Sequence, residues 1–140
     1  MRRVLALTLL SVAAAVGPAQ AQSAAATGSY MIFFPWNEPR IDQDAAAMLD
    51  NAAAAYIQSP GGAVRISGHS DRSGPAASNR RSAAARAEAV RACLAGRGVP
   101  AGVMTVATFG EERPLIATED GVREPQNRRV DITFGAGSER

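Results

Sequence analysis

Short apolar stretches alternate with two helical patterns between residues 30 and 135, and this order restricts the fold more than any other feature. The runs 30–34, 63–67, 103–109 and 130–134 predict four strands. Helical patterns separate the first strand from the second, and the second from the third. Right-handed crossovers would place both helices on one face of the sheet. The sequence therefore predicts an α+β fold, with two main helices packed on one face of a four-stranded mixed sheet.

The first helical pattern has a recognisable start and end. Asp42 suits the N-cap position, and the dipeptide Ser59-Pro60 marks the end of the helix. Its apolar residues recur at helical spacing and predict the buried face. They are Ala47, Met48, Leu49, Ala52, Ala55 and Tyr56.

The second helical pattern has a clear core face and two alternative starts. Pro75 fits the first turn, with Ser73 or Gly74 as the cap, while Asn79 or Ser82 would cap a later start. The core stripe follows the spacing i, i+4, i+7, i+11 in either case. It consists of Ala83, Ala87, Val90 and Leu94.

The first 21 residues have the layout of a secretory signal peptide. Arg2 and Arg3 precede an apolar run at 4–16, and Ala19-Gln20-Ala21 resembles a cleavage site. The run is shorter than the roughly 20 residues that cross a bilayer, which favours cleavage over an uncleaved anchor. We therefore expect a signal peptide at 1–21, a flexible lead at 22–29, one domain at 30–135 and a tail at 136–140. The mature chain would have no transmembrane segment.

Charge and composition argue against several functions. The formal net charge of +2 equals the contribution of Arg2 and Arg3, so the mature chain is nearly neutral and gives no basis for nucleic-acid binding. Cys93 and His69 are the single cysteine and the single histidine, so we expect neither a metal site nor an internal disulfide. No cofactor is expected either.

Polar residues gather where the second strand gives way to the second helix. Asp71 comes just after the strand, and Arg86 lies on the helix. Asn79 precedes Arg86 by seven residues and shares its helix face. Because Ser82 and Ala83 between them are small, we expect a shallow groove near a helix N-terminus, where free N–H groups favour anions.

Such a groove suits a small ligand that carries both charges. An ammonium would face Asp71, and the planar fork of Arg86 would match a carboxylate. The far end of diaminopimelate in a peptidoglycan stem peptide has both groups when it is not cross-linked. The spacing alone leads to a zwitterion groove and does not name the ligand.

An ordered set of short motifs extends from Tyr30 to Phe134. They are Ile32-Phe33-Phe34, Ile66-x-Gly68-His69-Ser70-Asp71-x-x-Gly74, Asn79, Arg86-Ala87-x-x-Val90-x-x-x-Leu94, Gly98-Val99, Phe109-Gly110-Glu111-x-Arg113-Pro114 and Asn127-Arg128-Arg129-Val130-x-Ile132. With these motifs the chain resembles the OmpA-like C-terminal domain, the peptidoglycan-associated module of outer-membrane proteins, lipoproteins and flagellar stators.

The resemblance implies a βαβαββ sandwich that binds diaminopimelate. It implies that Asp71 receives the ligand ammonium and Arg86 the carboxylate. Three further residues would border the pocket, and two arginines would lie at its edge or beneath it. The three are Ser70, Gly74 and Asn79, and the two are Arg128 and Arg129. The resemblance also implies a non-enzymatic periplasmic module that links peptidoglycan to envelope components and is associated with the outer membrane.

The chain departs from the family pattern at three places. Ser70 replaces the usual threonine and keeps the hydroxyl, while Ser82-Ala83 replaces Leu-Ser and removes a packing group and a hydroxyl from the helix face. The first loop has Pro35-Trp36-Asn37 where an acidic residue is usual. Trp36 would either form a wall of the pocket or pack on the surface.

Simpler roles for these residues, and two other functions, are alternatives to this interpretation. Asp71 could brace its own loop, and Arg86 could pair with Glu88, Glu111 or Glu112. An alternative function is a periplasmic protein-interaction subunit with a weakened glycan site, because of the altered helix face and first loop. A wall hydrolase is disfavoured, since the chain lacks a metal cluster and paired carboxylates and has one histidine.

Overall fold

A computed structural model describes residues 26–135 of the chain. The signal peptide predicted at 1–21 and the tail predicted at 136–140 lie outside the described residues. Strand β1 (Gly28–Phe33) begins two residues earlier than the sequence predicts, so Gly28 and Ser29 belong to the sheet and not to the flexible lead. Ala26 is also tied to the domain, because its N–H donates to the carbonyl of Ser59 over 2.8 Å.

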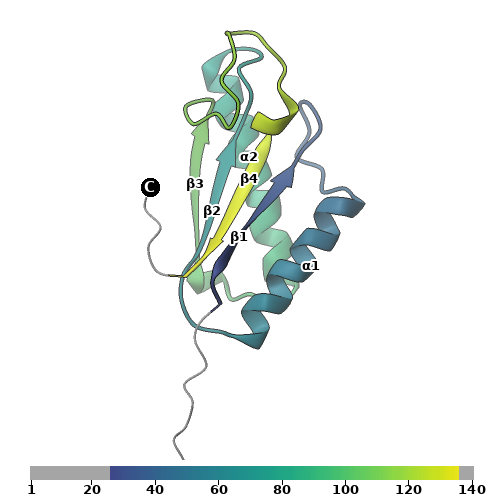
Figure 1. The fold of residues 1–140 in the computed structure, drawn as a ribbon, viewed down its shortest axis with the longest axis vertical. Coiled ribbons are helices and arrows are strands. Elements are labelled where there is room, and N and C mark those ends of the chain that lie inside the picture. The colour runs from purple at the N-terminus through teal and green to yellow at the C-terminus, as the bar shows by residue number, and fades with distance from the viewer. Residues whose placement is uncertain (1–25, 136–140) are drawn as a thin grey trace, which may run out of the picture.

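The sheet has four strands in the order β1-β4-β2-β3. The other strands are β2 (Val64–His69), β3 (Met104–Gly110) and β4 (Arg129–Phe134). β2 and β3 run parallel, while β4 is antiparallel to both β1 and β2. Helices α1 (Gln43–Gln58) and α2 (Ala76–Gly96) lie on the same side of the sheet, as Figure 1 shows. The predicted fold class is therefore confirmed.

The core lies between the helices and one face of the sheet. The predicted stripe of α2 is confirmed, since Ala83, Ala87, Val90 and Leu94 are all 0% exposed. The prediction for α1 was partly wrong, because Met48 is 38% exposed and Ala47 is exposed too. The buried positions of α1 are Ala45, Leu49, Ala52, Ala53 and Tyr56. This stripe faces β1 and α2, and residues 47 and 48 lie beside it.

Helix α2 begins at Ala76, one residue after the earlier of the two predicted starts. Pro75 occupies the N-cap and no side chain caps the helix, so neither Ser73 nor the later candidates Asn79 and Ser82 have that role. The Ser73 hydroxyl instead donates to the Asp71 carboxylate over 2.5 Å. The start of α2 is thus free of capping side chains and opens toward the loop after β2.

Gly68 sets the distance between β2 and α2. A Cβ at this position would lie 2.2 Å from the carbonyl oxygen of Ala83 and 3.1 Å from the Cβ of Ala87. A glycine is therefore required for the helix backbone to approach the strand this closely. The contact fixes the helix that carries Arg86 against the strand that leads to Asp71.

The long connection between β3 and β4 is held by one buried side chain. Asn127 is 0% exposed and lies in a short 3-10 turn, Pro125–Asn127. Its Oδ1 accepts from the N–H groups of Leu115 and Ile116, and its Nδ2 donates to the carbonyl of Ile116 over 2.7 Å.

Within residues 26–135, no helix has the length and hydrophobicity needed to cross a membrane.

Candidate ligand-binding site

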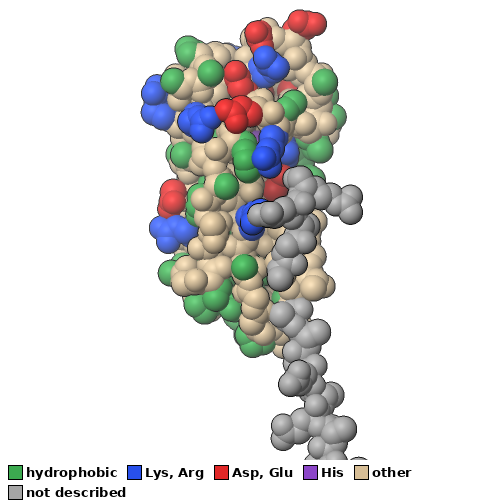
Figure 2. Space-filling model, turned by 90° about the vertical axis from the view of Figure 1, so that its left-hand side faces the viewer, with side chains coloured by type: hydrophobic (Ala, Val, Ile, Leu, Met, Phe, Trp, Pro, Cys, Tyr) green, Lys and Arg blue, Asp and Glu red, His purple; other side chains and the backbone are tan. Residues whose placement is uncertain are grey.

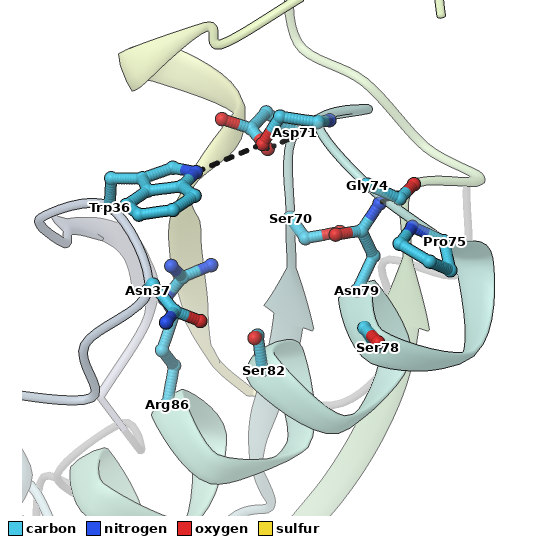
Figure 3. Close-up of a pocket in the computed structure, with 11 residues that line it drawn as sticks. Trp36, Asn37, Ser70, Asp71, Gly74, Pro75, Ser78, Asn79, Ser82 and Arg86 are labelled. Carbon is cyan, nitrogen blue, oxygen red and sulfur yellow. Dashed lines mark hydrogen bonds between the residues drawn. The ribbon is translucent and has the colours of Figure 1, made fainter. Parts of the chain in front are cut away.

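A cavity of about 200 Å³ opens between the first loop, the loop after β2 and the start of α2. Most of its lining residues have polar or charged side chains, and they come from these three segments. The lining residues are Trp36, Asn37, Ser70, Asp71, Ser73, Gly74, Pro75, Ser78, Asn79, Ser82 and Arg86. Arg86 enters from α2 and Asp71 from the loop after β2 (Figure 3). No ion pair joins Asp71 to Arg86, so the space between them is not closed by a direct contact.

Arg86 is a buried cation held by neutral groups. It is 2% exposed, and its guanidinium donates to the carbonyls of Glu38, His69 and Pro35 over 3.2–3.4 Å. No carboxylate of residues 26–135 lies within 4.0 Å of its nitrogens. Burial lowers the pKa of Arg86, and the nearby charge of Arg128 lowers it further, while Asp71 partly opposes both. A ligand anion would relieve this unfavourable burial of charge.

Asp71 is also buried, but its charge is already partly compensated. Its Oδ1 accepts from the backbone and hydroxyl of Ser73, at 3.2 and 2.5 Å. Its Oδ2 accepts from Arg128 Nη1 at 3.1 Å, and the two side chains are 4% and 11% exposed. Arg128 is thus the partner of Asp71 and does not line the cavity itself. A ligand ammonium would have to share the carboxylate with Arg128.

The remaining polar side chains frame the opening. Ser70 lines the cavity. Its Oγ is buried and has no hydrogen-bond partner. Asn79 donates to the carbonyl of Gly74 over 3.2 Å and to Glu111 over 2.8 Å. The Glu111 contact ties the start of α2 to the end of β3. Local sequence patterns could not predict this contact, because the two residues come together only through the parallel pairing of β2 and β3.

Trp36 forms a wall of the cavity and also faces solvent. It is 45% exposed, and its indole N–H donates to Ser73 Oγ over 3.1 Å. The guanidinium carbon of Arg123 lies 3.7 Å from the centre of the ring. Ser73 and Arg123 therefore hold the indole in place. Of the two positions considered for Trp36 in the sequence analysis, the structure shows the one in the wall of the cavity.

Five of the seven predicted site residues line the cavity, while Arg128 contacts Asp71 without lining it. Ser70, Asp71, Gly74, Asn79 and Arg86 all line the cavity. Arg129 does not, because it begins β4 and its side chain lies with Asp131 in a different cavity. Neighbouring residues of an extended chain point to opposite sides, so Arg128 and Arg129 cannot both face the site.

Acidic and basic side chains are interspersed on the side of the molecule next to β3, as Figure 2 shows. No group of three histidine, cysteine, aspartate or glutamate side chains within the described residues could hold a metal ion. His69 lies outside the candidate site, where its ring stacks on Phe109 with centres 5.4 Å apart.

The fold is that of an OmpA-like α+β domain. The sequence model of the OmpA family matches residues 33–128. The chain is 38% identical over 108 residues to the peptidoglycan-associated lipoprotein of Rhizobium meliloti, and the match covers 76% of this chain. It is 34% identical over 110 residues to an outer membrane protein of Gluconacetobacter diazotrophicus. The chain belongs to the OmpA family.

Solved structures agree with this assignment. The crystal structure of the peptidoglycan-associated lipoprotein from Burkholderia pseudomallei matches with a TM-score of 0.69 at 28% identity, over 74% of this chain and 88% of that one. The two sequence relatives are longer than this chain. The match covers 61% of the Rhizobium protein. For the Gluconacetobacter protein, the match covers 74% of this chain and 29% of the relative.

Proposed function

We propose that the chain is a periplasmic module that binds peptidoglycan non-covalently by recognising the free end of diaminopimelate in the stem peptide. The observation that carries the proposal is the Arg86 guanidinium, which is 2% exposed, bonded only to carbonyls among the described residues, and turned to a cavity that Asp71 also lines. The names of the relatives, which include peptidoglycan-associated lipoproteins, support the same ligand.

Each end of the ligand has a matching group in the cavity. The carboxylate of diaminopimelate would accept from Arg86, where a guanidinium can donate two parallel hydrogen bonds. The ammonium would donate to Asp71 and to the unpartnered hydroxyl of Ser70. The indole of Trp36 would cover the methylene chain between the two charged ends. This arrangement requires both charges on one small ligand and gives the module its selectivity.

A stem peptide with lysine in place of diaminopimelate provides a sharp control. Lysine keeps the side-chain ammonium and lacks the carboxylate at the far end, so it retains the group for Asp71 and loses the group for Arg86. Isothermal titration of the chain from residue 22 onward with both peptides tests the proposal. We expect saturable binding of the diaminopimelate peptide and a loss of most of that affinity with lysine. Equal affinity for the two peptides would refute recognition through Arg86.

Location and attachment belong to the same proposal. The signal peptide expected at 1–21 would export the chain to the periplasm, where peptidoglycan lies. By binding the wall, the module would connect it to other envelope components, in association with the outer membrane. Fractionation of cells that express the full-length chain should recover the processed protein with the periplasm and the sacculi.

A protein-interaction subunit is the second candidate function. It is favoured by the pairing of Asp71 with Arg128 and Ser73, which leaves less of the carboxylate for a ligand ammonium. This function predicts that crosslinking in cells captures envelope proteins while purified chain fails to co-sediment with diaminopimelate-type sacculi. Sedimentation that depends on Arg86 would decide against it.

A further inference from the structure

A second polar cavity lies on the face of the sheet that the helices leave uncovered. Its volume is about 260 Å³. Its lining residues alternate along the strands with the core residues, so they point away from α1 and α2. They are Arg65, Ser67 and His69 of β2, Phe109 of β3, Arg113 after β3, and Arg129, Asp131 and Thr133 of β4.

Arg129 in this cavity is buried and has one donor unused. Its residue is 6% exposed. Its Nε donates to Asp131 over 3.1 Å and its Nη2 donates to the carbonyl of Arg113 over 3.3 Å. Its Nη1 is buried and has no hydrogen-bond partner. A buried donor of this kind is costly unless an acceptor binds to it.

A stack of side chains forms a firm wall beside Arg129. Phe109 stacks with His69, whose ring centre is 5.4 Å away, and contacts the guanidinium of Arg113, whose central carbon is 3.8 Å from the Phe109 ring centre. His69 Nε2 also lies 3.2 Å from Asp131 Oδ2, without the alignment of a hydrogen bond. The Asp131 carboxylate thus already has two cationic or polar neighbours, which leaves Arg113 and the free donor of Arg129 to attract an anion.

Large apolar side chains lie next to this polar cavity. Phe33 pairs with Arg129 and Met31 pairs with Asp131 in the register of β1 and β4. They are 45% and 41% exposed. β1 is an edge strand of the sheet, so the cavity is flanked by an apolar strip at the margin of the sheet.

We propose that this face binds an extended acidic segment of a partner protein. One carboxylate of the segment would enter the cavity and accept from Arg129 Nη1, while Arg113 attracts it from the exposed rim. Apolar side chains next to that carboxylate would cover Met31 and Phe33. Charge complementarity and the apolar strip together favour a peptide that alternates acidic and apolar residues over a small free anion.

Titration of the ¹⁵N-labelled chain from residue 22 onward, with the peptide Ac-Glu-Leu-Glu-Leu-Glu-NH₂ as the probe, tests this proposal. We expect saturable shifts of backbone amides on β2 and β4, such as Ser67 and Asp131. Arg129→Gln should abolish saturation, and a dispersed spectrum checks that this variant folds. Arg113→Gln changes an exposed side chain and should weaken binding roughly twofold to fivefold. Arg91→Gln, on α2, is the control of equal charge change and should leave binding unchanged.

Four results would overturn the proposal. The first is that the amide shifts do not saturate, and the second is that a peptide with glutamine in place of glutamate causes the same shifts. The third is that Arg113→Gln and Arg91→Gln weaken binding by the same factor. The fourth is that the shifts are confined to Ser70 and Asn79. The last result would assign the peptide to the first cavity. Since Arg113 and Arg129 do not line that cavity, binding of the diaminopimelate peptide serves as an independent readout, and failure here would leave the proposed function standing.

Discussion

In the proposed function, the buried charge of Arg86 is the group that receives the ligand carboxylate. Its guanidinium donates to three carbonyls, two in the loop after β1 and one at the end of β2, and its central carbon lies 5.8 Å from the ring centre of Phe34. Neutral carbonyls satisfy its N–H groups without balancing its charge. The electrostatic attraction between this guanidinium and an incoming carboxylate is therefore stronger than it would be at an exposed arginine.

Arg86→Ala should weaken the binding of diaminopimelate-type sacculi by about 2–5 kcal/mol, because the ligand carboxylate would lose its charged partner. Co-sedimentation over a range of protein concentrations measures the change. Arg91→Ala, one and a half turns further along α2 and partly exposed, is the matched control and should bind like the unaltered chain. Equal binding by both variants would contradict the assigned role of Arg86.

The ion pair of Asp71 with Arg128 makes Asp71 a poorer probe of binding than Arg86. Removing one member leaves the other as a buried unpaired charge, which costs about 3–5 kcal/mol of stability. We expect Asp71→Ala to lower the free energy of unfolding by about this amount, and Asp71→Ala/Arg128→Met to recover a large part of it. Urea unfolding of the two single variants, the double variant and the unaltered chain measures the coupling. Strictly additive effects would show that the pair is not coupled.

Asn127 is expected to hold the loop between β3 and β4 by itself. Asn127→Ala would leave the N–H groups of Leu115 and Ile116 without their acceptor, at a cost of about 1–3 kcal/mol for each group that stays buried. Urea unfolding measures the total loss. Hydrogen exchange should speed up first at the amides of residues 115 and 116, whereas uniform acceleration across the domain would argue against a local clamp.

At the scale of elements, the contact between β2 and α2 positions the candidate site. Both Asp71 and Arg86 depend on it, since one follows the strand and the other lies on the helix. Gly68 permits this contact at a separation that no other residue allows. The small residues Ala83 and Ala87 on the facing side of α2 serve the same close packing.

Gly68→Ala should therefore damage both stability and binding. The new methyl group would meet the backbone of α2, and the forced shift should cost about 1–3 kcal/mol or more. Gly96→Ala, at the end of α2, is the control, because a Cβ there meets nothing within 4 Å. This substitution should be neutral or should stabilise the fold by up to about 1 kcal/mol. Thermal unfolding and sacculus binding of both variants check this, and a Gly68→Ala protein with unchanged properties would show that α2 can move away freely.

At the scale of the whole molecule, stability should depend on acidic pH through Asp131. Burial raises the pKa of this carboxyl, but contacts with His69 and Arg129 outweigh burial and leave the pKa below its usual value. A depressed pKa in the folded state contributes stability above the unfolded pKa of about 3.9, and the contribution is lost as pH falls through the folded pKa. Urea unfolding from about pH 7 down to about pH 2.5 should show a loss that Asp131→Asn reduces. An identical acid loss in this variant would remove Asp131 from the explanation.

Much of the fold followed from local patterns. The stripe of α2 predicted the buried face because helical periodicity depends on the residues of one segment. The same approach was wrong at Ala47 and Met48, since neighbouring elements decide which edge of an alanine-rich helix is covered. For the candidate site, sequence reasoning placed Asp71 and Arg86 on suitable elements. It missed the partners of Asp71 and Asn79, which lie 57 and 32 residues away along the chain.

The sequence alone determined the order of strands and helices, the core face of α2 and the candidate pair of opposite charges, because each depends on short-range spacing. The tertiary structure decided which charges neutralise one another. The register that sets β4 beside β2 brings Arg128 to Asp71 and turns Arg129 to the opposite face. Such contacts join residues far apart in the chain, and their geometry is fixed only when the sheet forms and the helices pack against it.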